Sequence, residues 1–459
     1  MALSRRDFLV RTGAAGLTVG IAGSVETLFT ANPAAGVRGP KTGYGPLAPD
    51  PRGILDLPKG FEYRILSREG QPMKSGGGLV PGRHDGMGSF AARGQRTHLV
   101  RNHEVYPDTV NRVPTAGLDT TYDPGAGGGT TNLVLGANHR TQEEYVSLGG
   151  TAINCSGGIT PWHTWLTCEE TEDKAGVNGY TKDHGWIFEV DPYNNRRNAD
   201  PFPLKDMGRF MHEAVAVDPR TGILYETEDA FSGAPLGSYY RFLPNKPRGR
   251  YGSLRAGGTL QALHVPGLED LSTVREVGTR FRGIEWLDVP DPEATTTPTR
   301  AQEYPKPITR GQKLEGAWWG NGNHSSYFVS SFARPEDGSA GSHDGQVWRY
   351  DPRSNTLTLE LIFTGTDAND DVYEKPDNMC VSPYGGLMIC EDSSGENYMI
   401  GTTAAGKPFV FARNRQVTTP GETGELSGVS FSPDGEVMYF NVYDPGTTFA
   451  VKGPWRRQK

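Results

Sequence analysis

Short apolar segments recur along the chain in pairs, and a tight turn separates the two members of each pair. The clearest pair, 214–217 and 223–225, flanks a turn that runs from Asp218 to Gly222. Similar pairs flank the turns 382–386 and 432–435, which contain Pro and Gly. Short apolar runs around such turns are typical of β-hairpins. Helical periodicity is scarce by comparison, so the pattern predicts an all-β fold.

The hairpins also share a polar pattern, because an acidic residue or a cysteine stands before the first apolar run. In the segment 154–170, Cys155 precedes the first run and Glu169 and Glu170 follow the second. Weaker copies occupy 85–104 and 315–331, which brings the number of predicted hairpins to six. Repetition of this kind predicts one supersecondary unit used several times.

A hairpin returns to the sheet edge that it left, so the residues that flank it lie at one end. Six hairpins arranged radially form a six-bladed β-propeller and bring these flanking residues to one mouth of a central channel. The strand-start positions are Asp85, Cys155, Glu213, Glu315, Asp377 and Glu425, and the strand-end positions are Glu104, Glu170, Glu228 and Asp392. Carboxylates gathered in this way repel one another, so we expect metal ions to compensate their charge.

Other segments complete the predicted propeller. The chain has 459 residues with 61 Gly and 34 Pro, which suits many short strands joined by turns. We expect residues 36–459 to form a single propeller domain with irregular or short helical insertions, since propellers often exceed average domain size. Further strands are predicted at 61–66, 131–135, 185–192, 238–242 and 345–352. The Pro-rich section 244–312 is expected to be irregular and to cover the channel mouth or a sheet edge.

The amino terminus predicts export. Arg5 and Arg6 precede the modest apolar stretch 13–23, and small residues follow around 31–35. Paired arginines in this context indicate a twin-arginine signal over residues 1–35, whose partner is the twin-arginine export machinery. The alternative is a solvated basic end followed by a core helix. No other apolar stretch reaches transmembrane length, so we expect a periplasmic or extracellular protein, monomeric and without a stable membrane span.

Charge and cysteine content restrict the partners and the redox state. The formal net charge is −8, which argues against nucleic acid or an anionic membrane as the main partner. The four cysteines are Cys155, Cys168, Cys380 and Cys390, and an oxidising compartment would allow them to pair. A Cys380–Cys390 disulfide would join two strands of one hairpin. A Cys155–Cys168 disulfide would remove the thiolate from the predicted metal site, and both pairings stay open.

Several of these motifs resemble one family. They are Arg101-Asn102-His103-Glu104, the segment 154–170, Met211-His212-Glu213-Ala214-Val215 and Lys375-Pro376-Asp377-Asn378. Together with the twin-arginine signal, they resemble the PhoX-type alkaline phosphatases over nearly all of the mature chain. The resemblance implies a six-bladed propeller with two ferric ions (Fe3+) and several calcium ions (Ca2+) around a bridging oxo group. It also implies small-molecule phosphate esters as substrates.

The resemblance also implies roles for particular residues. Cys155 corresponds to an iron-bound thiolate, with Glu228 or Glu226, Glu315 and Asp377 as further ligands, and Glu213 joins them as a strand-start acid. Glu170, Glu104, Asp392 and Glu425 correspond to oxygen donors on the calcium side. Lys313 stands two residues before Glu315, where a phosphate-binding arginine is expected. A lysine offers a point charge in place of the bidentate guanidinium fork, which weakens the orientation of a phosphate.

Three hypotheses about function follow. The leading hypothesis is an exported metal-dependent phosphomonoesterase in which metal-bound oxygen attacks the phosphate ester and Lys313 holds its charge. The second is a calcium-dependent propeller esterase or lactonase, which would keep its activity in a Cys155→Ala variant. The third is a non-catalytic extracellular binding propeller with structural calcium. A thiolate adds nothing to a site that binds calcium alone, which favours the first hypothesis.

Overall fold

The computed structural model describes residues 42–230, 235–363 and 373–457. The predicted signal segment 1–35 therefore lies outside the described residues. Within them, regular structure consists of β-strands and short 3-10 helices. None of the helices in this part of the chain is long and apolar enough to cross a lipid bilayer.

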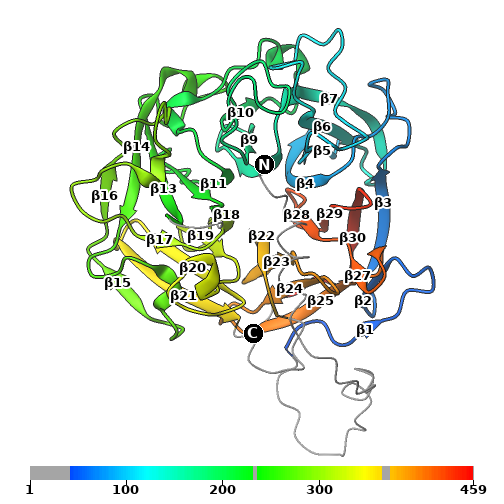
Figure 1. Ribbon diagram of the computed structural model, residues 1–459. Coiled ribbons are helices and arrows are strands. Elements are labelled where there is room, and N and C mark those ends of the chain that lie inside the picture. The colour runs from blue at the N-terminus through cyan, green and yellow to red at the C-terminus, as the bar shows by residue number, and fades with distance from the viewer. Residues whose placement is uncertain (1–41, 231–234, 364–372, 458–459) are drawn as a thin grey trace, which may run out of the picture.

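Six antiparallel sheets stand around a common axis, which confirms the predicted six-bladed propeller (Figure 1). Each predicted hairpin supplies the two innermost strands of one sheet. The first strands are β4 (His84–Ala92), β8 (Asn154–Ile159), β11 (His212–Val217), β18 (Leu314–Gly320), β22 (Pro376–Val381) and β28 (Leu426–Phe431). The second strands are β5 (Arg96–His103), β9 (Trp165–Glu169), β12 (Leu224–Glu228), β19 (Ser325–Ser330), β23 (Leu387–Glu391) and β29 (Val437–Val442). We number the sheets one to six in this order.

The outer strands predicted at 131–135, 185–192, 238–242 and 345–352 are confirmed as β6, β10, β13 and β20, and apart from the strand predicted at 61–66 the other outer strands were not predicted. The third strands are β6 (Gly128–Leu135), β10 (Ile187–Val190), β13 (Gly237–Pro244), β20 (Gly345–Asp351), β24 (Tyr398–Thr402) and β30 (Thr447–Lys452). The fourth strands include β7 (Thr141–Thr151), β21 (Thr356–Phe363) and β25 (Pro408–Asn414), to which β2 (Leu55–Pro58) and β1 (Leu47–Ala48) are added. A separate ribbon of β26 (Val417–Thr419) and β27 (Glu422–Thr423) precedes β28.

The section 244–312 differs from its prediction, because much of it is regular. It contains β14 (Gly258–His264) and β16 (Glu285–Asp288), which extend the third sheet, and β15 (Arg280–Arg282), which pairs with β21 of the fourth. Its last strand, β17 (Arg310–Gly311), pairs with the start of β13. The surrounding prolines mark the connections between these strands and do not interrupt them.

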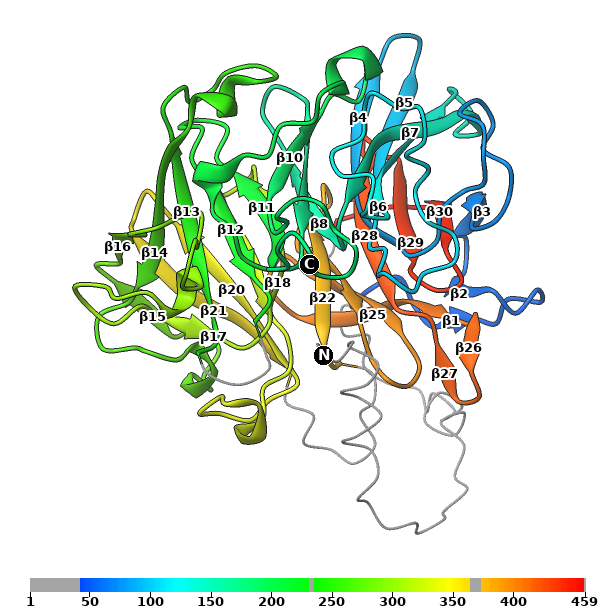
Figure 2. The same cartoon turned by 45° about the horizontal axis from the view of Figure 1, so that its top comes forward.

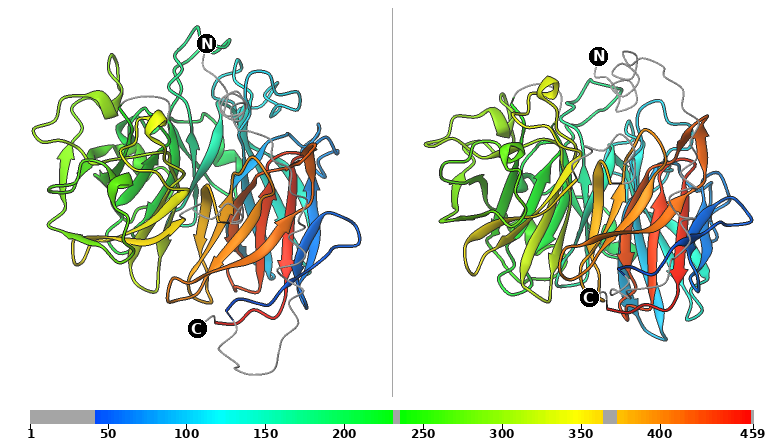
Figure 3. Two further views of the ribbon diagram at one scale, coloured as in Figure 1. Left: turned by 60° about the horizontal axis from the view of Figure 1, so that its bottom comes forward. Right: turned by 90° about the horizontal axis from the view of Figure 1, so that it is seen from below.

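The ring is closed by strands from both ends of the chain. β3 (Glu62–Arg68) pairs with β30, with Tyr63 opposite Val451, and so completes the sixth sheet. Figure 3 shows β3 in blue beside β30 in red, with the sheets standing side by side around the axis. Apolar side chains fill the spaces between the sheets, and Phe411, Met438 and Phe440 are fully buried in one such layer.

All six innermost strands contain a register shift near their start. The shifts fall between His84 and Met87, Asn154 and Gly157, His212 and Val215, Leu314 and Ala317, Pro376 and Met379, and Ser427 and Ser430. A β-bulge inserts an unpaired residue and redirects its side chain. The repeated bulge therefore sets the direction of one side chain in each sheet, close to the axis.

Candidate metal centre

A recurring backbone hydrogen bond aligns the six repeats. In every sheet, the N–H of the residue after the second strand donates to the carbonyl of the residue before the first strand. The pairs are Glu104 to Arg83 (3.0 Å), Glu170 to Ile153 (2.9 Å), Asp229 to Met211 (3.1 Å), Ser331 to Lys313 (2.9 Å), Asp392 to Lys375 (3.1 Å) and Tyr443 to Glu425 (3.0 Å). We call the donor the closing position, the acceptor the leading position, and the residue two places after the acceptor the bulge position.

The bulge position brings the predicted acids together. It is occupied by Asp85, Cys155, Glu213, Glu315, Asp377 and Ser427. Three groups have ligand atoms within 4.8 Å of one another: Asp85, Glu104 and Cys155; Cys155, Glu170 and Glu213; and Glu213, Glu315 and Asp377. Cys155 belongs to the first two groups and Glu213 to the last two. The groups therefore form one continuous arc over the first five sheets. Figure 2 shows the strands β4, β8, β11, β18 and β22, which carry the bulge positions of the arc.

The arc concentrates negative charge in a buried place. Every member is at least nine-tenths buried. Burial raises the pKa of Asp85 well above its ordinary value, and the charges of Glu104 and Glu425 raise it further. Burial also raises the pKa of the Cys155 thiol, whose sulfur lies 3.6 Å from Asp85 Oδ2. The arc therefore favours either bound protons or bound cations.

The donors of the arc suit metal ions. Asp85 Oδ1 and Glu104 Oε2 are buried and accept no hydrogen bond within the described residues. Buried oxygens of this kind are ordinarily satisfied by a partner such as a metal ion. One thiol among carboxylates suits a transition metal, and the remaining oxygens suit calcium. The residues present therefore fit a mixed centre of the predicted type.

Glu228 and Glu226 lie apart from the arc. The closing position of the third sheet is Asp229, one residue beyond Glu228, and a shift of one residue in a strand moves a side chain to the other face. Glu228 instead accepts hydrogen bonds from Arg300 (2.8 Å) and the Tyr240 hydroxyl (2.8 Å). Glu226 Oε2 lies 3.6 Å from His212 Nδ1. Neither glutamate belongs to any of the three groups of ligand atoms. That either one binds a metal stays a prediction.

Asp392 and Glu425 also lie outside the three groups. Asp392 occupies the closing position of the fifth sheet, as Glu104 and Glu170 do in the first two. Glu425 occupies the leading position of the sixth sheet and not the bulge position, where Ser427 stands. Its charge nevertheless acts on Asp85, which places Glu425 beside the arc.

The sequence pattern did not identify Asp229 or Arg300 as residues of this region. Asp229 is fully buried and contacts Lys313. Its only signal in the sequence is its place at the end of the acidic run 226–229. Arg300 comes from the section 244–312, and it pairs with Glu172 at 2.9 Å and with Glu228 at 2.8 Å. No motif marks Arg300.

All four cysteines are free thiols, so both disulfide alternatives are wrong. The strand register places Cys380 opposite Met388, so Cys390 is not its cross-strand partner. Cys390 Sγ lies 3.9 Å from Met399 Sδ. The Cys155 thiol is therefore free to act as a ligand in the arc.

Comparison with known proteins identifies the family of this chain. A family model described as alkaline phosphatase PhoX matches residues 42–446. The chain belongs to the PhoX alkaline phosphatase family. The structure of Pseudomonas fluorescens PhoX in complex with vanadate, a transition state analogue, matches with a TM-score of 0.62 and 16% identity, over 90% of this chain and 98% of that chain. A gluconolactonase from Xanthomonas campestris matches with a TM-score of 0.44 and 11% identity, over 90% and 99%. No curated protein matches the sequence.

Lys313 lies at the edge of the arc in this PhoX-family chain. It holds the leading position of the fourth sheet with a left-handed φ of 45°. Its Nζ lies 2.6 Å from Glu315 Oε1 and 3.1 Å from Asp229 Oδ2, and its side chain is 6% exposed. The ammonium group is therefore beside two acids of the region, within reach of whatever the arc binds. Its role in binding phosphate stays a prediction.

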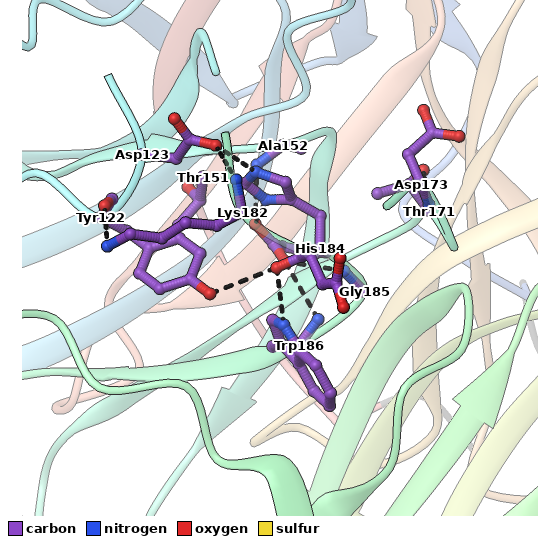
Figure 4. A network of polar contacts seen from close by, with 12 residues as sticks. Tyr122, Asp123, Thr151, Ala152, Thr171, Asp173, Lys182, His184, Gly185 and Trp186 are labelled. Atoms are coloured by element: carbon purple, nitrogen blue, oxygen red, sulfur yellow. Dashed lines mark hydrogen bonds and ion pairs between the residues drawn. The ribbon is translucent and has the colours of Figure 1, made fainter. Parts of the chain in front are cut away.

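A second polar network lies at the end of β9 in this PhoX-family chain, and Figure 4 shows its members Asp123, His184 and Trp186. Glu169 accepts hydrogen bonds from the backbone N–H groups of Ala152 (2.8 Å), Gly185 (2.8 Å) and Trp186 (3.0 Å). His184 Nδ1 lies 2.6 Å from Glu169 Oε1, and His184 Nε2 lies 3.3 Å from Asp123 Oδ2. Because Glu169 precedes Glu170, the network holds the end of β9 in place.

The charges of this network are well compensated. Burial alone would lower the pKa of His184, but the charges of Glu169 and Asp123 raise it. Burial alone would raise the pKa of Asp123, but hydrogen bonds from Gly125, Thr181 and Lys182 lower it to about 2. Asp123 and Glu169 therefore lie on the two sides of the imidazole, and the raised pKa of His184 favours its protonated form.

Proposed function

We propose that the protein is an exported, metal-dependent phosphomonoesterase whose arc holds iron and calcium. The observation that carries this proposal is the sharing of Cys155 and Glu213 among three buried groups of acids. A shared thiolate and a shared carboxylate suit neighbouring cations. Membership of the PhoX family supports phosphate esters as substrates. The vanadate bound to the Pseudomonas fluorescens protein supports the same chemistry.

In this proposal, Cys155, Glu213, Glu315 and Asp377 hold ferric ions, and Asp85, Glu104 and Glu170 supply oxygens for calcium. When bound, the cations neutralise the phosphate oxygens and lower the pKa of water that attacks phosphorus. Lys313 binds a phosphate oxygen through its charge. The Glu169 network positions Glu170, and burial of the arc excludes bulk water from it.

The test uses the purified mature protein, residues 36–459, with a chromogenic phosphate monoester. We expect hydrolysis that requires both iron and calcium, and elemental analysis that finds both metals. Activity that survives removal of both metals would contradict the proposal. A calcium-only esterase or lactonase would instead keep full activity in a Cys155→Ala variant.

The export part of the proposal has its own test. Replacing Arg5 and Arg6 with lysine removes the paired arginines that the export machinery reads. We expect the full-length variant to stay in the cytoplasmic fraction while the unchanged chain reaches the periplasm or medium. Export of both forms alike would refute a twin-arginine signal over residues 1–35.

A further inference from the structure

Two lysines occupy matching places in adjacent sheets. Lys313 and Lys375 hold the leading positions of the fourth and fifth sheets, whose first strands pack side by side. Both have a left-handed φ, 45° for Lys313 and 43° for Lys375. Each stands two residues before an acid of the arc, Glu315 or Asp377. The repeat therefore delivers two ammonium groups to the same end of the propeller.

The surroundings of the two ammonium groups differ. Lys313 is engaged by Asp229 and Glu315. Lys375 is half-buried, and no carboxylate of the described residues lies within ion-pair distance of its Nζ. Its Nζ lies 5.4 Å from the centroid of the Phe332 ring. An aromatic face holds a cation without neutralising its charge, so Lys375 is available to an anionic ligand.

Phe332 shows the direction in which Lys375 leans. It follows Ser331, the closing residue of the fourth sheet, whose N–H donates to the carbonyl of Lys313. Lys375 therefore reaches across from the fifth sheet toward the sheet that carries Lys313. Arg334 also lies over the Phe332 ring, at 6.0 Å, but it is paired with Asp344. Among these cations, Lys375 is the one without an acidic partner in the described residues.

Charge is distributed unevenly around the end of the propeller that carries the arc. The closing positions of the first three sheets are Glu104, Glu170 and Asp229, whereas the fourth sheet has Ser331. The fifth sheet closes with Asp392, and a cation also holds the leading position of the first sheet, Arg83. Lys313 and Lys375 are the two cations that hold the leading positions of neighbouring sheets, and such a pair can orient a ligand with two separated negative charges.

We propose that Lys375 binds a second anionic group on the leaving group of the phosphate ester. Preferred substrates are then monoesters whose alcohol carries a carboxylate or a further phosphoryl group close to the ester oxygen. The proposal rests on the proposed function, because it places the reacting phosphoryl group at the arc beside Lys313. The second anion would contact the Lys375 ammonium on the Phe332 side.

The test measures the binding of three phosphonates to the metal-loaded protein by calorimetry, because phosphonates are not hydrolysed as esters. Propylphosphonate lacks a second charge, 3-phosphonopropionate carries a carboxylate, and propane-1,3-bisphosphonate carries a second phosphonate. We expect Lys375→Met to weaken binding of the two doubly charged compounds by about tenfold and of propylphosphonate by less than about twofold. Unequal losses for the carboxylate and the bisphosphonate identify the preferred anion.

Two further variants serve as controls. Lys375→Arg should restore most of the lost affinity, because it restores the positive charge. Lys407→Met removes an exposed lysine from the turn between β24 and β25, at the opposite end of the fifth sheet, and should change nothing. Methionine is an unbranched, flexible side chain of similar length, and Lys375 is only half-buried, so the fold should tolerate Lys375→Met.

The outcomes separate this inference from the proposed function. Equal loss of affinity for all three compounds, no loss for any, or no binding to the unchanged protein would overturn the role of Lys375. Hydrolysis of ethyl phosphate and phosphoglycolate is measured separately. The protein could bind 3-phosphonopropionate through Lys375 and yet hydrolyse neither ester. This result would support the role of Lys375 and would refute the proposed phosphomonoesterase activity.

Discussion

At the scale of single residues, a shift of one position decides which acid of the run 226–229 faces the axis. The sequence predicts the hairpin and its acids, but the register depends on which backbone groups pair. The recurring hydrogen bond assigns the closing position to Asp229, and Glu228 faces Arg300 instead. The pattern of residue types was therefore sufficient to predict that Cys155 lies in the arc. It was insufficient to predict which acid holds the closing position of the third sheet.

This difference predicts that two neighbouring substitutions differ in their effect on catalysis. Glu228→Gln leaves Arg300 with one fewer charged partner in a buried place. We expect it to lower the free energy of unfolding by about 2 kcal/mol and to leave the metal content unchanged. Asp229→Asn should lower stability by a similar amount, because Asp229 is an equally buried partner of Lys313, and should also lower kcat/KM by about tenfold. Denaturant unfolding and steady-state kinetics measure both variants, and a loss of kcat/KM in Glu228→Gln without one in Asp229→Asn would contradict the assignment.

Cys155 offers a sharper test at the same scale. Cys155→Ser should remove iron and reduce phosphatase activity by about 100-fold or more, because a hydroxyl is a poor substitute for a shared thiolate. Cys380→Ser is the matched control, since Cys380 is an equally buried free thiol in a hydrophobic layer. Elemental analysis should find iron in the control variant. Full iron occupancy in Cys155→Ser would show that the Cys155 thiol is not an iron ligand.

At the scale of elements, the pattern of apolar and polar residues predicted the six hairpins and four of the six third strands, but not β24 or β30. It gave no sign of the six bulges. The residue types around a bulged residue such as Asp85 do not differ from those around a regularly paired strand residue. The strands β14 and β16 were also missed, since the prolines around them indicate irregular structure. They form because the exposed edge of the third sheet offers them pairing partners.

The network that holds the end of β9 predicts a dependence of stability on pH. The pKa of His184 is raised in the folded protein above its ordinary value of 6.5. The contribution of His184 to the stability of the folded protein is therefore complete below pH 6.5. It is lost as the pH rises through the pKa that His184 has in the folded protein. The Tm of the unchanged protein should fall, relative to that of His184→Gln, as the pH is raised above neutrality. Parallel curves for the two proteins would show that His184 stays neutral.

At the scale of the whole molecule, the arc predicts that metal ions stabilise the propeller. In metal-free protein the raised pKa of Asp85 means that stability is lost as the pH rises above its ordinary value of 3.8. Bound cations favour the ionised form and remove this loss. Chelation should therefore lower the Tm, and the difference between loaded and stripped protein should grow with pH. A difference that is absent, or that shrinks with pH, would contradict a metal-filled arc.

The arrangement of the whole ring was predicted from the repeats and from the family resemblance, but its closure was not. The strand at 61–66 was expected without a partner, because no local pattern in β3 specifies pairing with a strand at the far end of the chain. Pairing of Tyr63 with Val451 is determined by the geometry of the ring, in which the sixth sheet has room for one more strand.

The junction of β3 with β30 has a consequence for the order of events during synthesis. β3 leaves the ribosome among the first strands and has to wait for β30, which leaves it last. Local hairpins can form early, but the ring cannot shut while translation continues. In the proposed metal-bound protein, a full set of cations can therefore be enclosed only after β30 has left the ribosome.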